Sequence, residues 1–405
     1  MDTNGIDLLR LEVEKIYGKK VLSSADCQQL CIDLCQRTML RVSFNTLRRV
    51  FKLIKDNHTA SNYTCEVLAE YCGFGSYNEF IAFKKKSQSS EAGLHDTSLL
   101  EFLIRVFKNV EVKNSWDITY FSLVKQTINY LDRHSGIVDL FQREISRTKN
   151  GQDFYFEQFI NIDQLNDYYG DGLRYYLREK NTTHAQILGN SLLCFRNWMT
   201  LNTKGVNKHL DVVSSYNIDI MAPPGICARY FASQVYYIHL LGLDPTPMIT
   251  KAREFYLFIP SSKYNYSTYF CFEMVISEAL LLTGQYEESV FYLDEVLEKI
   301  KLNIPSYIDV ALLETIYLFK AIAYMNLGKK SAAKVLFNSI DKNKFYFLSR
   351  IYLTILYLSL SRKFKAKQVE TEQAMKLIEE TGFSRLKVLW PSFNTGISVQ
   401  AVNNN

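Results

Sequence analysis

Turn-forming residues are scarce in this chain, and their scarcity restricts the possible folds more than any other feature. Only 17 glycines and 7 prolines are spread over 405 residues. Long elements joined by short connections are therefore expected, which favours helices over many short strands. The hydrophobic fraction of 47% and the charged fraction of 22% are typical of a folded globular protein. The chain is too long for one ordinary core, so we expect two or three structural units in an all-α protein.

The charge and cysteine patterns indicate a cytoplasmic protein without a membrane anchor. Asp7, Arg10 and Glu12 interrupt the first apolar residues, unlike a secretory signal. The most apolar stretch, residues 351–360, is about half as long as a bilayer span requires. The cysteines show no disulfide-framework spacing, as expected for reduced thiols. The net charge of +5 is too small to indicate a nucleic-acid partner by itself.

Hydrophobic periodicity divides the chain into a small helical module, a linker and a long helical region. Residues 1–86 are predicted to form five short helices. Residues 87–96 (SQSSEAGLHD) are small and polar, as in a linker. A helical pattern then continues almost unbroken over residues 97–381, which leaves residues 382–405 as a C-terminal tail.

A weak internal repeat lies within residues 265–381. A small residue, a turn glycine, a second small residue and a bulky residue recur in the same order and at the same offsets. The first set is Ser277, Gly284, Tyr286, Ser289, Leu293 and Val296, and the second is Ala321, Gly328, Lys330, Ala333, Phe337 and Ile340. This pattern resembles the tetratricopeptide repeat, with a longer period than is usual for that family. The resemblance covers residues 265–381. Residues 97–260 show no clean repeat, but we expect similar helical hairpins there, so that residues 97–381 form a tetratricopeptide-like α-solenoid.

The segment from Arg37 to Phe80 is the most informative part of the chain. It contains SFNTLRRVF, beginning at Ser43, and SNYTCEVLAEYCGFGSYNEF, beginning at Ser61. The segment resembles the helix-turn-helix domains of lambda-repressor type. It resembles more closely the N-terminal module of a group of cytoplasmic Bacteroidota proteins, which pair this module with a helical C-terminal region. The resemblance implies a helix-turn-helix-like module in residues 1–86 and no established activity.

A basic face on the third predicted helix is the candidate DNA-binding site. Between Arg37 and Lys55 there are basic residues and no acidic ones. The apolar residues of this helix recur at helical spacing, at Leu47, Val50, Phe51 and Ile54, and so the polar residues face outward. Side chains near the start of a recognition helix are the ones that reach base edges. The candidate DNA-contacting residues are Ser43, Asn45, Arg48, Arg49, Lys52 and Lys55. The competing interpretation is a solvated basic face.

Three cysteines, Cys27, Cys31 and Cys35, share one face of the second predicted helix. A metal site would need a fourth ligand and a closer spacing between thiolates. Three small core residues explain the pattern equally well, so we expect core packing, with a redox or metal site as the alternative.

Three carboxylates, Asp163, Asp167 and Asp171, have the spacing of a row along one helix. Such a row is either a solvated stripe or a docking surface for a basic peptide. The aromatic segments 230–237 and 264–272 are likewise open to two interpretations, helix packing or the lining of a peptide groove.

No pattern typical of catalysis is present in the sequence. The histidines are dispersed, and both the His-Glu-x-x-His and Gly-x-Ser-x-Gly motifs are absent. We therefore expect no enzyme activity, no cofactor and no metal. The leading hypothesis is a cytoplasmic regulatory or adaptor protein whose solenoid binds a protein or peptide partner and whose N-terminal module contacts double-stranded DNA, as a homodimer. The alternative is a pure interaction scaffold, without DNA binding, in which residues 1–86 cap the solenoid.

Overall fold

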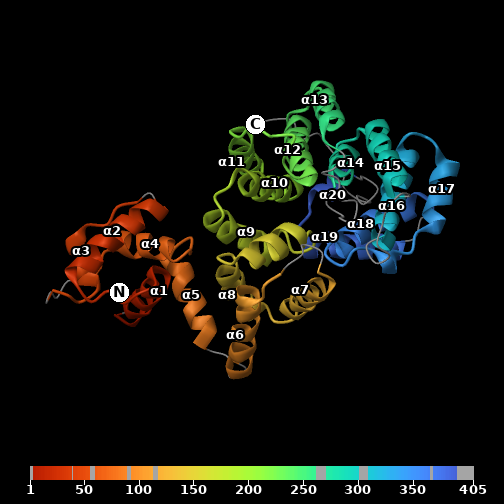
Figure 1. Ribbon diagram of the computed structural model, residues 1–405. Helices are drawn as coiled ribbons and strands as arrows, with labels where there is room; N and C mark the ends of the chain where they lie inside the picture. Colours follow the sequence, from red (N-terminus) through yellow and green to blue (C-terminus); the bar gives the residue numbers. More distant parts are fainter. Residues whose placement is uncertain are drawn as a thin grey trace. The chain divides into compact units, whose positions relative to one another are not determined.

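The computed structural model describes residues 3–38, 40–54, 60–88, 93–112, 117–260, 271–300, 309–364 and 368–389. Over these residues the protein is all-α, with helices and no strands (Figure 1). Helices pack mainly against their neighbours in sequence, as in a helical array. The prediction of an all-α protein is confirmed. The chain forms two compact units: unit 1 comprises residues 1–106 and 128–143, and unit 2 comprises residues 107–127 and 144–405.

The chain passes from one unit to the other within α6, α7 and α8. Unit 1 contains α1 (Thr3–Tyr17), α2 (Ser24–Thr38), α3 (Phe44–Val50), α4 (Asn62–Tyr71), α5 (Tyr77–Gln88), most of α6 (Gly93–Asn109), the end of α7 (Ile118–Leu131) and most of α8 (Ser135–Ile145). The first helices of unit 2 are the π-helix η1 (Gly151–Gln158), α9 (Tyr168–Glu179), α10 (Thr183–Met199), α11 (Thr203–Ser214), α12 (Pro224–Leu241) and α13 (Thr246–Phe258). The remaining helices are α14 (Phe272–Leu282), α15 (Tyr286–Ile300), α16 (Asp309–Asn326), α17 (Lys330–Ser339), η3 (Lys342–Lys344), α18 (Arg350–Phe364), α19 (Gln368–Thr381) and α20 (Arg385–Leu389).

The five helices predicted for residues 1–86 are present as α1 to α5. Two of them begin at serine caps, at the serines that open the two informative stretches of the sequence. The hydroxyl of Ser43 accepts the backbone N–H of Thr46 at 3.1 Å, and that of Ser61 accepts the N–H of Thr64 at 3.2 Å. Each bond satisfies a backbone donor that has no partner inside its helix. The apolar faces of these helices enclose one core.

The helix α3 is shorter than its apolar pattern predicts. It ends at Val50, and Lys52 adopts a left-handed backbone with φ of 56°. The N–H of Leu53 donates to the carbonyl of Arg48 at 2.8 Å, and that of Lys52 donates to the carbonyl of Arg49 at 3.0 Å. These two bonds form the Schellman arrangement that closes many helices. The prediction that the helix continues to Ile54 is therefore wrong, because the chain reverses at Lys52.

The predicted linker, residues 87–96, is helical at both of its described ends. Residues 87–88 belong to α5 and residues 93–96 to α6. Residues 89–92 lie outside the part of the chain that the structure describes.

Two consecutive helical hairpins, α14 with α15 and α16 with α17, contain the positions that recur in the sequence. Gly284 and Gly328 lie at their turns, with φ of 83° and 76°. In the first hairpin, the hydroxyl of Ser289 donates to the backbone carbonyl of Ser277 at 2.9 Å, which is possible only where the two helices approach closely. Ala321 and Ala333, at the matching positions of the second hairpin, are fully buried.

The last helices of unit 2 contact its first ones. The carboxylate of Asp163, which precedes α9, accepts the backbone N–H groups of Ile351 and Tyr352 at 2.9 Å each. Asp163 thus caps the N-terminus of α18 from a distant part of the sequence. The short helix α20 packs against α10 and α19. All residues of α14 are buried, so this helix is enclosed within unit 2.

Candidate functional site

The predicted DNA-contacting residues that the structure describes lie on or beside α3, and we call them the α3 surface: Ser43, Asn45, Arg48, Arg49 and Lys52. Ser43, Asn45, Arg49 and Lys52 are exposed, whereas Arg48 is half-buried. Lys55 lies outside the described residues. The structure therefore brings Asn45 and Arg49 to the surface on a helix that carries no acidic residue.

Two members of the α3 surface are held by contacts within α3 itself. The hydroxyl of Ser43 is occupied as the helix cap. The guanidinium of Arg48 lies 5.3 Å from the ring centroid of Phe44, and its Nη1 donates to Oδ1 of Asn45 at 3.4 Å. Arg48 thus lies along its own helix, a position that the sequence pattern did not reveal.

Lys52 does not lie on the helix face where the periodicity placed it. Because the chain reverses at this residue, its ammonium reaches Asp7 of α1 at 3.2 Å. Both side chains are largely exposed, at 67% and 43%, and such a pair contributes less than about 1 kcal/mol. Lys52 can therefore exchange this carboxylate for another anion at little cost.

Arg10 was not identified from the sequence, yet it anchors the end of α3. Its Nη1 donates to the carbonyl of Val50 at 3.2 Å, and its Nη2 lies 2.8 Å from Asp7. A cation that satisfies a C-terminal carbonyl stabilises the helix end. No local sequence signal identifies such a contact, because α1 and α3 meet only in the folded unit.

The cysteine row on α2 lies partly in the core. Cys27 is fully buried, and burial raises the pKa of its thiol to about 11. Cys31 is half-buried, its pKa is also raised by burial, and its thiol donates to the carbonyl of Val42 at 3.5 Å. Among the described residues, no group of three or more His, Cys, Asp or Glu side chains could hold a metal ion.

The carboxylate row expected on one helix does not exist. Only Asp171 lies within α9, Asp167 directly precedes it, and Asp163 caps α18. The prediction failed because the i, i+4 spacing forms a stripe only if the whole segment is helical, and residues 163–167 are not in an α-helix.

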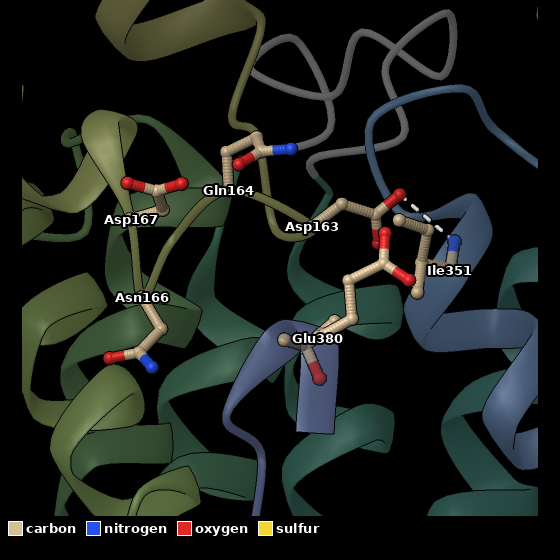
Figure 2. A pocket seen from close by; sticks show the side chains of 7 residues that line it. Asp163, Gln164, Asn166, Asp167, Ile351 and Glu380 are labelled. Atoms are coloured by element: carbon tan, nitrogen blue, oxygen red, sulfur yellow. Dashed lines mark hydrogen bonds between the residues drawn. The ribbon is translucent and has the colours of Figure 1, made fainter. Parts of the chain in front are cut away.

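Asp163 and Asp167 instead line a small cavity of about 190 Å³ in unit 2 (Figure 2). Glu380, from the end of α19, also lines this cavity. The full lining is Asp163, Gln164, Asn166, Asp167, Ile351, Glu380 and Thr381. Its carboxylates favour a cationic over an anionic occupant.

The aromatic segment 230–237 belongs to α12 and faces the interior of unit 2. Phe231 and Tyr236 are buried, and the ring centroid of Tyr236 lies 4.7 Å from that of Trp198. These residues pack helix against helix. Residues 264–270, most of the second aromatic segment, lie outside the described residues.

The first part of the predicted C-terminal tail packs into the same interior. Phe383 and Leu386 are fully buried, and Arg385 lies against Trp198 of α10. The apolar residues Phe383 and Leu386 are the signal in the sequence that this part of the tail is buried, although Phe383 itself precedes α20.

Comparisons with known proteins add no family or relative. No protein-family model, curated protein or solved structure matches this chain. In the described residues, no helix has both the length and the apolar character needed to cross a membrane.

Proposed function

We propose that this protein is a cytoplasmic regulatory or adaptor protein. On this proposal the array of unit 2 is a tetratricopeptide-like solenoid that binds a protein or peptide partner. In unit 1, α2 and α3 act as a helix-turn-helix, and the α3 surface contacts double-stranded DNA.

The observation that supports DNA contact is the exposure of Asn45 and Arg49 on a helix without carboxylates. Arginine and asparagine form the bidentate contacts that read guanine and adenine in the major groove. Lys52, close by and held only by an exposed ion pair, would contact a phosphate.

The observation that supports a protein partner is a pair of exposed apolar residues on α13. Leu257 and Phe258 are each 72% exposed. Large apolar side chains left exposed at successive positions of a helix are more typical of an interaction surface than of a solvated face. Contact with a partner would remove both from water.

The DNA proposal is tested with the intact protein and a random-sequence duplex, by fluorescence anisotropy over about 50–300 mM salt. We expect binding that weakens steeply with salt. A random-sequence duplex offers Arg49 no specific base to read, so Arg49 contacts phosphate there. Arg49→Ala should therefore weaken binding and lower the salt slope by about one. Asn45→Ala should weaken binding without changing the slope, because the side chain is uncharged. The matched control is Lys251→Ala, which removes an exposed charge from α13 in unit 2. Equal binding by wild type and Arg49→Ala would show that the α3 surface does not contact DNA.

A second candidate function is a protein-interaction scaffold in which the N-terminal helices have a structural role. It is favoured by a buried ion network that joins α1, α5 and α8: Glu12 lies 2.7 Å from Arg143 and 2.8 Å from Lys84. Such a network ties the first helices to a later one within unit 1. If the intact protein binds no duplex even at about 50 mM salt, the scaffold is the better account.

A further inference from the structure

Residues 383–389 form a short segment that is ordered by its surroundings. The helix α20 has only five residues, and a helix of that length is not stable alone. It packs against α10 and α19 in unit 2. Its conformation therefore depends on the side chains that it buries there.

Three side chains anchor the segment. Phe383 is fully buried, with its ring centroid 6.4 Å from that of Phe195 and 6.2 Å from that of Tyr352. Leu386 is also fully buried. Arg385 donates from Nε to the backbone carbonyl of Trp198 at 2.6 Å, and its guanidinium lies 4.5 Å from the Trp198 ring centroid.

Arg385 differs from an arginine of a stable core in the way its charge is balanced. It is only 8% exposed, yet no carboxylate in the described part of the chain neutralises it. Burial lowers the pKa of Arg385, as expected when a cation leaves water without a counter-ion. Such burial costs free energy that one hydrogen bond and a cation–π contact offset only in part. Arg385 therefore contributes less to holding the segment than an arginine paired with a carboxylate would.

The segment contacts Phe195 and Trp198 of α10, and Tyr236 and His239 of α12 pack against these two rings. We call these four residues the Trp198 surface. Trp198 is fully buried, and its indole N–H has no acceptor among the described residues. The ring centroids of Trp198 and His239 are 5.5 Å apart. The surface thus combines an aromatic floor with an unused hydrogen-bond donor.

We propose that the Trp198 surface is a peptide-binding site, filled here by Phe383, Arg385 and Leu386 of the same chain. The partner segment that replaces them carries an aromatic residue, an arginine two positions later and a leucine directly after it. This inference rests on the proposed role of the array in binding a protein or peptide. The protein's own segment competes at an effective concentration of about millimolar order, and so it keeps the site closed to weak ligands.

The test uses the full-length protein and a fluorescent peptide with the sequence of residues 380–389, ETGFSRLKVL. The triple variant F383A/R385A/L386A releases the internal segment. The control K387A/V388A alters the same helix at Lys387 and Val388, whose side chains are partly or largely exposed. We expect the triple variant to bind the peptide at least about 10-fold more tightly than wild type or the control, since the competing segment is gone. A peptide carrying the same three alanine changes should bind no variant.

The idea is overturned if the triple variant keeps its helical circular dichroism but binds the peptide no better than wild type. If the triple variant does not fold, hydrogen exchange on the wild-type protein tests instead whether the segment opens locally. The amides of Leu386 and Lys387, bonded to the carbonyls of Phe383 and Ser384, should then exchange at least about 10-fold faster than those of α14, because the segment opens locally. If these amides and those of α14 exchange at the same rate, the segment opens only when the whole protein unfolds, and the proposal of a releasable segment is refuted.

The α3 surface and the pair Leu257 and Phe258 are unchanged in these variants, so a failure here leaves the proposed function standing.

Discussion

Buried charges in this protein are neutralised to different extents. Glu12 and Arg143 are both buried and lie 2.7 Å apart, and the Arg143 guanidinium also lies 5.3 Å from the Phe74 ring centroid. Burial alone would raise the pKa of Glu12, but Arg143 and Lys84 outweigh it and hold that pKa below its usual value. Arg385 has no such counter-ion in the described chain. The first arrangement is suited to a permanent core contact and the second to a reversible one.

Arg143→Ala should destabilise unit 1 strongly. The change leaves the Glu12 carboxylate buried with Lys84 as its remaining close cation, and loss of one partner of a buried pair costs about 3–5 kcal/mol. The control Arg105→Ala removes an arginine that is 74% exposed and 3.9 Å from Glu101, for which we expect less than about 1 kcal/mol. Urea unfolding followed by circular dichroism measures both. Similar midpoints for the two variants would contradict a stabilising role for the pair.

Acidification should destabilise the protein through His209. Burial, helped by Lys208 and Arg196, lowers the pKa of His209 from 6.5 to about 4. The imidazole Nδ1 lies 2.9 Å from Oδ1 of Asn190. Since the unfolded chain takes up the proton first, stability is lost as the pH falls from about 6.5 towards about 4. His209→Gln should lose less stability between pH 7 and pH 5 than wild type. Parallel losses, measured by chemical denaturation at the two pH values, would exclude His209 as the cause.

At the scale of the element, the residues at turns and helix ends decide where each helix stops, more than the residues of helix interiors do. The apolar periodicity of α3 suggested a helix to Ile54, but a reversal at Lys52 ends it at Val50. The hairpins α14–α15 and α16–α17 likewise depend on one left-handed glycine each.

Gly328→Ala should destabilise unit 2 through backbone strain alone. Nothing lies within 4 Å of a Cβ added at this position, but its φ of 76° belongs to the left-handed region. A side chain in that region costs about 1–2 kcal/mol. The control Lys330→Ala, two residues further along the same hairpin, removes an exposed side chain and should cost less than about 0.5 kcal/mol. Thermal unfolding of both variants tests the difference, and an unchanged Gly328→Ala midpoint would show that the turn tolerates strain.

At the scale of the whole molecule, contacts between distant segments complete unit 2. Asp163 joins the approach to α9 with the start of α18. Arg385 joins α20 to α10. These contacts place residues 383–389 inside the unit, against α10 and α19.

Asp163→Ala should weaken this closure. It removes the acceptor of two backbone N–H groups at the start of α18, and loss of a helix cap costs about 1–2 kcal/mol. Asp167→Ala is the matched control, because Asp167 is exposed and its side chain forms no cap hydrogen bond. Hydrogen exchange of the Ile351 and Tyr352 amides should accelerate in Asp163→Ala and stay unchanged in Asp167→Ala. Equal protection in both variants would show that Asp163 does not hold α18.

The candidate site was only partly predictable. Ser43, as a helix cap, followed from local sequence because a cap bonds to its own helix. The exposure of Asn45 and Arg49 followed from the apolar face opposite them. The contact of Lys52 with Asp7 and that of Arg10 with Val50 could not be predicted, since each joins residues about forty positions apart.

The sequence by itself determined the all-α class, the five N-terminal helices and the glycine turns of two hairpins, because caps, periodicity and glycine conformation act over a few residues. Only the tertiary structure decided where Asp163, Arg143 and Arg385 lie. Each of these side chains meets partners that are distant along the chain, and the free energy of such contacts depends on burial and geometry that no local pattern contains. For the same reason, the occupied Trp198 surface became visible only once α10, α12 and α20 were placed together.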